Sequence, residues 1–270
     1  MSLIDRDLTT IAFCWRLERC DGVTLGFTTH DRDLVVEGLR YRAAPGMLPS
    51  AITLSDGFDA DTLEVAGALT SDAITARDLA SGRWDGAAVR MFMIDWTDPG
   101  GENVAVARGT LGDVSVTGEG FSAALRGPAA MLDAPVVELT SPECRAMLGD
   151  KRCRIDMAAR TWITRIVAIV SDDVIDVAAA AAGNAYAYGR LRWLGGANSG
   201  LENPILASAG TRLMLRDAPA FAPSVGDRVE IMEGCDKQFS TCVQRFANAV
   251  NFRGEPHLPG VDLLTRYPGA

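Results

Sequence analysis

The sequence predicts a mainly β protein with two modules, each a barrel or a sandwich, and a few short helices. Three observations favour this class. Hydrophobic residues make up 48% of the 270 residues and charged residues 23%, an ordinary globular balance. Short segments with alternating apolar positions recur along the chain, as in half-buried strands. Gly, Pro and Asp pairs separate these segments at the spacing typical of β barrels and sandwiches.

The first half begins with a strand in residues 11–19 (IAFCWRLER), where large apolar side chains occupy alternate positions. The pairs Asp21-Gly22 and Glu37-Gly38 each predict a hairpin. A helix is expected over 72–80, capped by Ser71 or Asp72 and ended by Gly82. Further strands are expected at 23–30, 33–36, 39–43, 51–54, 63–69, 89–96, 104–111, 114–117 and 121–125, with a turn at Gly112-Asp113.

The character of the chain changes after Gly127-Pro128, so we expect an N-terminal domain over 1–135 and a C-terminal domain over 136–270. The second domain contains a β module at about 160–233. Helical segments are expected at 129–132, from Ser141-Pro142-Glu143 onward, and at 240–249. The strands of this module are expected at 161–170, 174–181, 190–194, 205–210, 211–217 and 227–233.

Charge and hydropathy exclude several classes of protein. The net charge of −9 and a pI near 4.8 argue against nucleic acid or an anionic membrane as the main partner. No apolar run approaches the roughly 20 residues of a transmembrane helix. The N-terminal residues MSLIDRD carry acids where a signal peptide has basic residues. We therefore expect a soluble chain made in the cytosol.

Six cysteines in such a chain indicate buried thiols, metal ligands or redox groups rather than a disulfide scaffold. Cys144 and Cys153 have eight residues between them, Cys235 and Cys242 have six, and the long stretch 154–234 separates the two pairs. These intervals do not match the CxxC pairs of a zinc ribbon and suit a larger iron–sulfur centre. Two alternatives stay open on spacing alone, namely four unligated buried thiols and a zinc ion with four cysteine ligands.

Basic residues gather beside both cysteine pairs in an otherwise acidic chain. We expect these cations to lower the thiol pKa values and to offset the negative charge of a bound cluster. They are Arg145, Lys151, Arg152, Arg154, Lys237, Arg245 and Arg253.

Two groups of residues resemble a known family. GCDKQFSTC at 234–242 is followed by RFANAVNFRGEPHLPG, and preceded by RWLGGANSGLENPI at 192–205 and SVGDRVEI at 224–231. This region resembles the C-terminal part of baseplate-hub or tail-tip proteins of long-tailed phages and gene transfer agents, a group that includes the lambda-type tail-tip protein. TLGFTTHDRDLVVEGLRYRA at 24–43 resembles the opening of the gene-transfer-agent branch.

The resemblance implies a structural, non-enzymatic virion component at the distal end of a tail, assembled in the bacterial cytoplasm as a homotrimer. Its expected partners are a distal tail ring protein, a tip or fibre-bearing protein and a tail-associated peptidase. It implies a [4Fe-4S] cluster held by Cys144, Cys153, Cys235 and Cys242, which would staple the C-terminal half. The competing interpretation is an iron–sulfur redox protein or a cysteine hydrolase at the tail tip.

Other polar residues receive weaker interpretations. Cys14 and Cys20 are assigned no ligand role, and His30 lies in a segment, THDRD, that predicts a polar turn between strands. His257 is a surface contact or a hydrogen-bond partner near the metal site. Asn248, Asn251 and Phe252 are expected to order the segment around the cluster, or else merely to pack a loop.

Overall fold

The computed structural model describes residues 10–43, 47–49, 62–68, 74–117, 120–127, 137–181 and 183–258. The chain divides into two compact units, Met1–Val136 and Val137–Ala270. None of the helices in the described ranges is long and apolar enough to cross a membrane. The predicted strand at 51–54 and the predicted helical turn at 129–132 lie outside the described residues.

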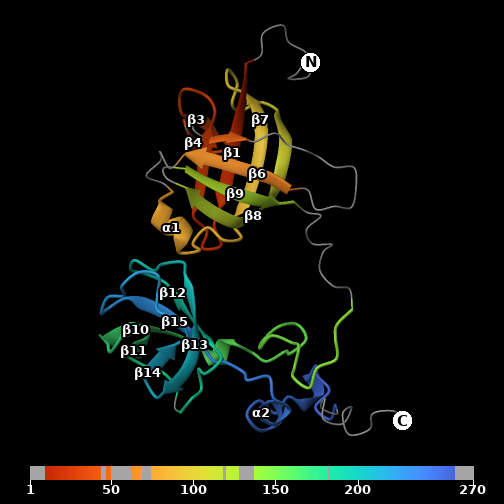
Figure 1. Cartoon of the computed structure of the whole chain (residues 1–270), viewed down its shortest axis with the longest axis vertical. Helices are drawn as coiled ribbons and strands as arrows, with labels where there is room; N and C mark the ends of the chain where they lie inside the picture. The colour runs from red at the N-terminus through yellow and green to blue at the C-terminus, as the bar shows by residue number, and fades with distance from the viewer. Residues whose placement is uncertain are drawn as a thin grey trace. The chain divides into compact units, whose positions relative to one another are not determined.

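The first unit contains one nine-stranded sheet and a short helix (Figure 1). Its elements are β1 (Ile11–Glu18), β2 (Thr24–Thr28), β3 (Leu34–Val36), β4 (Leu39–Ala43), β5 (Met47–Pro49), β6 (Thr62–Ala68), α1 (Ala76–Ala80), β7 (Ala88–Asp95), β8 (Asn103–Thr117) and β9 (Gly120–Arg126). The strand order is β3-β4-β2-β1-β7-β8-β9-β6-β5, and neighbours are antiparallel except β2 and β4.

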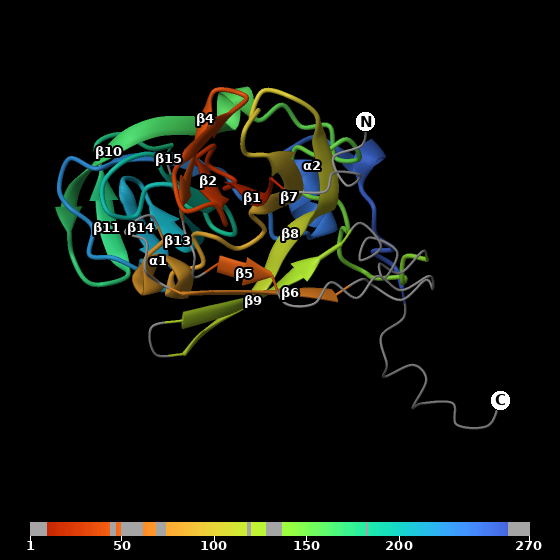
Figure 2. The ribbon, with the colours of Figure 1, turned by 90° about the horizontal axis from the view of Figure 1, so that it is seen from above.

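This unit was predicted as a barrel or a sandwich, but its described strands form a single sheet with β3 and β5 at the edges. Figures 1 and 2 show β6 and β9 turning across β1 and β7, so the curved sheet encloses its own core. Trp15 and Leu17 of β1 pack there with Met91, Leu111 and Trp84. The period-2 alternation of β1 thus predicted the burial of Trp15 and Leu17, but Ile11 and Phe13 are only half-buried. The opposite face of the strand is buried as well, because Ala12 and Cys14 belong to a second core cluster.

The described turns of this unit lie where the sequence predicted them, with one exception. Glu37 and Gly38, between β3 and β4, both have positive φ, 51° and 78°, as a type I′ hairpin requires. The predicted turn at Gly112-Asp113 is wrong, because β8 continues through it with a shift of register between Leu111 and Val114. A β-bulge accommodates Gly112 and Asp113 without ending the strand.

The helix predicted over 72–80 is shorter in the structure. It spans Ala76–Ala80, and the Thr75 hydroxyl, not Ser71 or Asp72, accepts a hydrogen bond from the Asp78 N–H at 3.1 Å. Ser71 and Asp72 lie outside the described residues. Gly82 follows the helix with φ +73°, so the predicted end is confirmed.

The second unit contains a closed six-stranded barrel, as predicted, with the order β10-β11-β14-β13-β12-β15. Its strands are β10 (Thr161–Ile169), β11 (Val174–Val177), β12 (Arg190–Trp193), β13 (Glu202–Ala209), β14 (Arg212–Leu215) and β15 (Arg228–Met232). Every strand sends alternate apolar side chains into one core, where Ile175, Leu191, Leu213, Val229 and Ile231 are fully buried. The barrel closes because β10 pairs with both β11 and β15.

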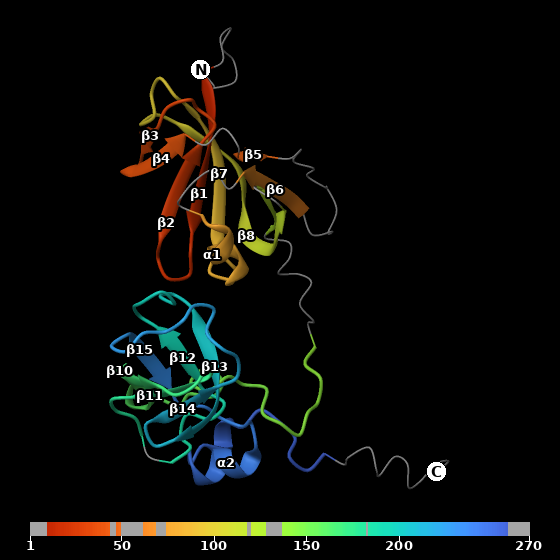
Figure 3. The same ribbon diagram turned by 60° about the vertical axis from the view of Figure 1, so that its left-hand side comes forward.

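The rest of the second unit lies outside the barrel, at one of its ends (Figures 1 and 3). It comprises the segment 137–157, a 3-10 turn η2 (Ala158–Arg160), the helix α2 (Phe239–Gln244) and a 3-10 turn η3 (Ala249–Asn251). The helix predicted at 240–249 is thus interrupted, because Ala247 adopts a left-handed φ of 48° and the Asn248 N–H turns back to the Cys242 carbonyl at 3.0 Å.

Candidate metal centre

The four predicted cysteine ligands line one cavity that is partly open to solvent. Cys153 and Cys242 are buried, whereas Cys144 and Cys235 are half-buried, and all four are free thiols. The fold thus brings together two segments that lie on either side of the whole barrel in the sequence. The rest of the lining is mostly apolar, and includes Ala146, Leu148, Ile155, Phe246 and Phe252. Across the described ranges, no three His, Cys, Asp or Glu side chains are arranged to hold a single metal ion.

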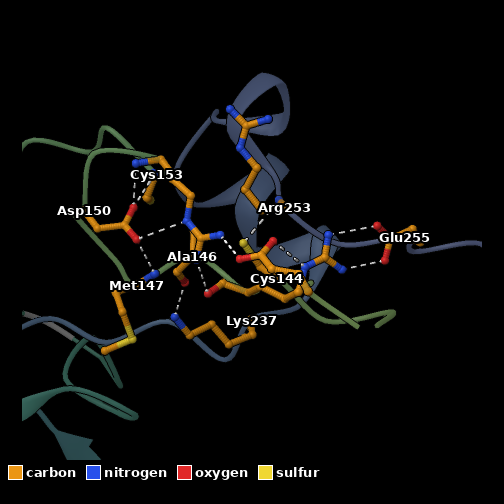
Figure 4. A network of polar contacts seen from close by, with 11 residues as sticks. Cys144, Ala146, Met147, Asp150, Cys153, Lys237, Arg253 and Glu255 are labelled. Atoms are coloured by element: carbon orange, nitrogen blue, oxygen red, sulfur yellow. Dashed lines mark hydrogen bonds and ion pairs between the residues drawn. The ribbon is translucent and has the colours of Figure 1, made fainter. Parts of the chain in front are cut away.

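Cys144 lies in a segment without regular secondary structure, so the helix predicted to start at Ser141-Pro142-Glu143 is not formed. The backbone of this segment bonds to distant residues instead of to its own next turn. The Cys144 N–H donates to the Lys237 carbonyl and the Arg145 N–H to the Arg253 carbonyl, both at 2.9 Å. Figure 4 shows Cys144 between these two C-terminal partners. Long-range pairing therefore overrides the local helix signal.

Cys153 is held by a tight loop organised around Asp150 (Figure 4). The Asp150 carboxylate accepts backbone hydrogen bonds from Cys153 at 2.6 Å, Arg152 at 2.8 Å and Met147 at 2.9 Å. The hydrogen bond from the Cys153 N–H makes the largest contribution to lowering the pKa of the Asp150 carboxyl group. The charged carboxylate thus orders the loop that presents the Cys153 sulfur.

Cys235 follows the end of β15 after Glu233 and Gly234, and Cys242 lies within α2. Burial raises the pKa of both thiols. For Cys242 the neighbouring thiols of Cys144, Cys235 and Cys153 raise the pKa further, which reflects how close the four groups are. For Cys235 the backbone N–H and the charge of Lys237 lower the pKa, but by less than burial raises it. Lys237 thus has the expected effect on Cys235, but burial outweighs it, and the causes of the Cys242 shift include no cation.

The cations near the site bind carboxylates and carbonyl groups rather than the sulfurs. Arg145 forms a bidentate pair with Glu255 at 2.7 and 2.9 Å, and Lys237 donates to the Ala146 carbonyl. Arg245 contacts Glu233 at 2.7 Å. These contacts join segments far apart in the sequence. No local pattern could have paired Arg145 with Glu255, because the two residues lie at opposite ends of the second unit in the sequence.

Two of the sulfurs receive hydrogen bonds from N–H groups. The Arg253 backbone N–H points at Cys144 Sγ at 3.4 Å, and the Asn248 side-chain amide lies 3.7 Å from Cys153 Sγ. Asn251 donates to Asn248 Oδ1 at 2.7 Å, and Phe252 lines the cavity. The expectation that these three C-terminal residues order the segment around the cysteines therefore agrees with their contacts.

The other candidate residues do not line this cavity. Cys14 is buried in a core cluster of the first unit, and burial raises the pKa of its thiol. Cys20 is exposed, with its sulfur 3.9 Å from the Asp85 carbonyl. His30 lies in the predicted polar turn and stacks on Trp96 with ring centroids 5.1 Å apart. His257 is exposed.

Comparison with known proteins identifies the family of this chain. The family model described as "Baseplate hub protein, N-terminal attachment domain" matches residues 1–156, more than half of the chain. The chain belongs to the baseplate hub protein family. A second family model, described as phage conserved hypothetical protein BR0599, matches residues 184–262 of this hub-family chain, which include Cys235 and Cys242.

A solved structure extends the likeness of the hub-family chain to nearly its full length. The match covers 98% of this chain and 94% of the other chain, with 37% sequence identity and a TM-score of 0.85. That structure is described as the virion of a native gene transfer agent particle. A search of curated proteins found no match.

Proposed function

We propose that this chain is a structural subunit of the baseplate hub at the distal end of a phage-like tail, in a gene transfer agent or a long-tailed phage. The similarity that supports this spans both units, not only the N-terminal attachment domain. The similar solved structure is part of an assembled gene transfer agent particle. The subunit carries out no turnover chemistry in this proposal; its role is to connect neighbouring tail proteins.

We further propose that Cys144, Cys153, Cys235 and Cys242 hold a [4Fe-4S] cluster. The single observation that supports this most directly is that all four cysteines line one cavity. An iron–sulfur cluster needs four thiolates at separate corners of a multi-atom body. A lone zinc ion instead requires four sulfurs about 2.3 Å from one point. The intervals within the two cysteine pairs, eight and six residues, do not match the CxxC pairs of zinc ribbons and favour the cluster.

The surroundings of the cysteines suit a buried anionic cluster. N–H groups point at Cys144 and Cys153, and such hydrogen bonds offset negative charge on coordinating sulfur. Phe246 and Phe252 contribute apolar surface that limits solvent access. The contact of the Cys242 thiol with the Asn248 carbonyl, at 3.4 Å, belongs to the protonated thiol and is given up when the sulfur binds metal.

The cluster would act as a staple. It joins the segment before the barrel to the segment after it, and so closes a loop that includes the whole barrel. Crosslinking a loop of roughly 80 residues removes about 4–5 kcal/mol of unfolded-chain entropy by the polymer estimate. The free energy of metal binding would therefore add to the folding stability of the second unit.

Metal analysis tests the cluster proposal. Protein purified without oxygen should contain about four irons and four acid-labile sulfides per chain. The variant Cys235→Ser should lose both, whereas Cys20→Ser, which lies in the other unit, should retain them. About one zinc per chain would contradict the cluster while keeping a metal staple, and the absence of both metals in wild type would leave only buried thiols.

Particle assembly tests the hub proposal separately. In the particle we expect three copies around the tail axis, in contact with a distal ring protein, a tip or fibre-bearing protein and a tail-associated peptidase. Deleting the gene should yield particles without a tail tip. A single copy per particle would refute the trimer. Complete tail tips accompanied by a lost redox or hydrolytic activity would favour the enzyme interpretation.

A further inference from the structure

Asn248 connects two of the four cysteines through both its backbone and its side chain. Its backbone N–H donates to the Cys242 carbonyl at 3.0 Å. Its side-chain nitrogen Nδ2 lies 2.7 Å from the Cys153 carbonyl oxygen and 3.7 Å from Cys153 Sγ. Because Cys153 precedes the barrel and Cys242 follows it, Asn248 is a bridge between separate segments of the site.

Asn251 determines which end of the Asn248 carboxamide faces the sulfur. Its Nδ2 donates to Asn248 Oδ1 at 2.7 Å, and that oxygen can only accept. The NH2 group must therefore point the other way, toward Cys153. It carries two hydrogens, one for the carbonyl oxygen and one for the sulfur, so the Cys153 contact uses its full donor capacity.

We propose that Asn248 is a positioning residue that donates a hydrogen bond to the metal-bound sulfur of Cys153, and thereby retains the cluster and raises its reduction potential. This inference rests on the proposed [4Fe-4S] site. A donor to a coordinating sulfur withdraws charge from it, which stabilises the more negative, reduced cluster. The same bond holds Cys153 in the orientation that the cavity requires.

The variant Asn248→Asp tests this role, because aspartate has the same shape but presents an oxygen acceptor to the sulfur. We expect the reduction potential of the cluster to become more negative and iron release to a chelator to accelerate about tenfold or more, as for other residues that support metal ligands. Asn248→Ala should shift both quantities in the same direction by less, since it removes the donor without adding charge.

Two further variants complete the test. Asn103→Asp makes the same chemical change in β8 of the first unit, where Oδ1 accepts from Arg90 at 3.1 Å and an aspartate can still accept. This control should behave as wild type. Asn251→Ala leaves Asn248 intact but removes the donor that orients it, so it should give an intermediate shift even if Asn248→Asp fails to fold.

The possible outcomes separate this inference from the proposed function. If wild type holds four irons and Asn248→Asp matches its potential and release rate, the inference is wrong and the cluster stands. Reduced iron content with an unchanged potential in the remaining clusters would show a purely structural role and also overturn it. Wild-type protein that contains zinc or no metal would refute the cluster and this inference together.

Discussion

At the scale of single residues, the junction between the barrel and the cysteine site depends on two glycines at a chain crossing. A Cβ at Gly234 would lie 2.0 Å from the Ala187 carbonyl oxygen and 2.1 Å from the Gly189 nitrogen. A Cβ at Gly189 would lie 2.1 Å from the Met232 carbonyl oxygen. These contacts involve backbone atoms, which cannot rotate away. Gly234 immediately precedes Cys235, so the crossing sets where that ligand begins.

We expect Gly234→Ala to lower the free energy of unfolding of the second unit by about 1–3 kcal/mol, the usual cost of overpacking. The same substitution should also reduce the metal content, because a shift of residue 234 displaces the adjacent ligand Cys235. Thermal unfolding and iron analysis measure the two effects. Gly195→Ala is the matched control, since its nearest neighbour would be the Arg228 nitrogen at 3.9 Å. Equal stability of the two variants would contradict the steric argument.

At the scale of elements, the β3–β4 hairpin contains a residue unsuited to its backbone conformation. Glu37 has a φ of 51°, a left-handed value that costs side-chain-bearing residues roughly 1–2 kcal/mol. Its ion pair with Arg16, at 3.9 Å and half-exposed, offsets little of this cost. The hairpin forms because Gly38 accepts the second left-handed position and because Tyr41 and Val36 are buried.

We therefore expect Glu37→Asn to stabilise the first unit by about 0.5–1 kcal/mol, since Asn tolerates the left-handed conformation better. Gly38→Ala should destabilise it by a similar amount, because alanine is strained at φ +78°. Chemical denaturation of the two variants measures both changes. A stabilising effect of Gly38→Ala would show that the turn type differs from type I′.

The irregular segment that carries Cys144 is held to the C-terminal part of the unit by the Arg145–Glu255 pair. The bond from Arg145 is the largest cause that lowers the pKa of Glu255 from 4.5 to about 2. A carboxyl whose pKa is depressed in the folded state stabilises the fold above its unfolded pKa. This contribution is complete above about pH 4.5 and is lost as the pH falls from there to about 2.

We expect Glu255→Gln to lower the unfolding temperature of metal-free protein at pH 6, and the difference from wild type to shrink as the pH falls from 4.5 toward 2. Unfolding curves at stepwise pH measure the difference. Glu102→Gln, at an exposed position of the first unit, makes the same charge change and should follow wild type throughout. A difference in unfolding temperature that stays constant down to pH 2 would contradict a stabilising role for the Arg145–Glu255 pair.

At the scale of the whole molecule, the two units have separate hydrophobic cores. One is built from β1, β7, β8 and β9 with Trp84, and the other fills the barrel of the second unit. The described residues that line the cysteine cavity all belong to the second unit. The energy of metal binding should therefore stabilise one unit and leave the other unchanged.

Removing the metal with a chelator should increase hydrogen exchange in peptides from 161–232 and leave peptides from 11–43 unchanged. The free energy of unfolding of the second unit should fall by up to roughly 4–5 kcal/mol, because the unfolded chain regains the entropy that the crosslink had removed. Exchange measured by mass spectrometry resolves the two regions. Equal loss of protection in both would mean that the units unfold as one, and no change in either would mean that the staple does not stabilise the barrel.

Local patterns in the sequence determined most of the secondary structure. Period-2 alternation identified most of the described strands, and the Asp-Gly and Glu-Gly pairs identified hairpins, because strand alternation and tight turns depend on neighbouring residues alone. The C-terminal motif also singled out Cys235 and Cys242, and Cys144 and Cys153 followed from the same resemblance. These are properties that a few adjacent residues encode.

Only the tertiary structure decided how distant segments meet. The closure of one sheet into a barrel and the open, curved form of the other depend on which edge strands pair, and no local pattern specifies that. Three contacts likewise join segments that the whole barrel separates in the sequence. They are the backbone bond from Cys144 to Lys237, the Arg145–Glu255 pair and the contacts of Asn248 with Cys153. Such contacts gain their energy from burial and long-range hydrogen bonds, which outweigh the local helix signal at Ser141-Pro142-Glu143.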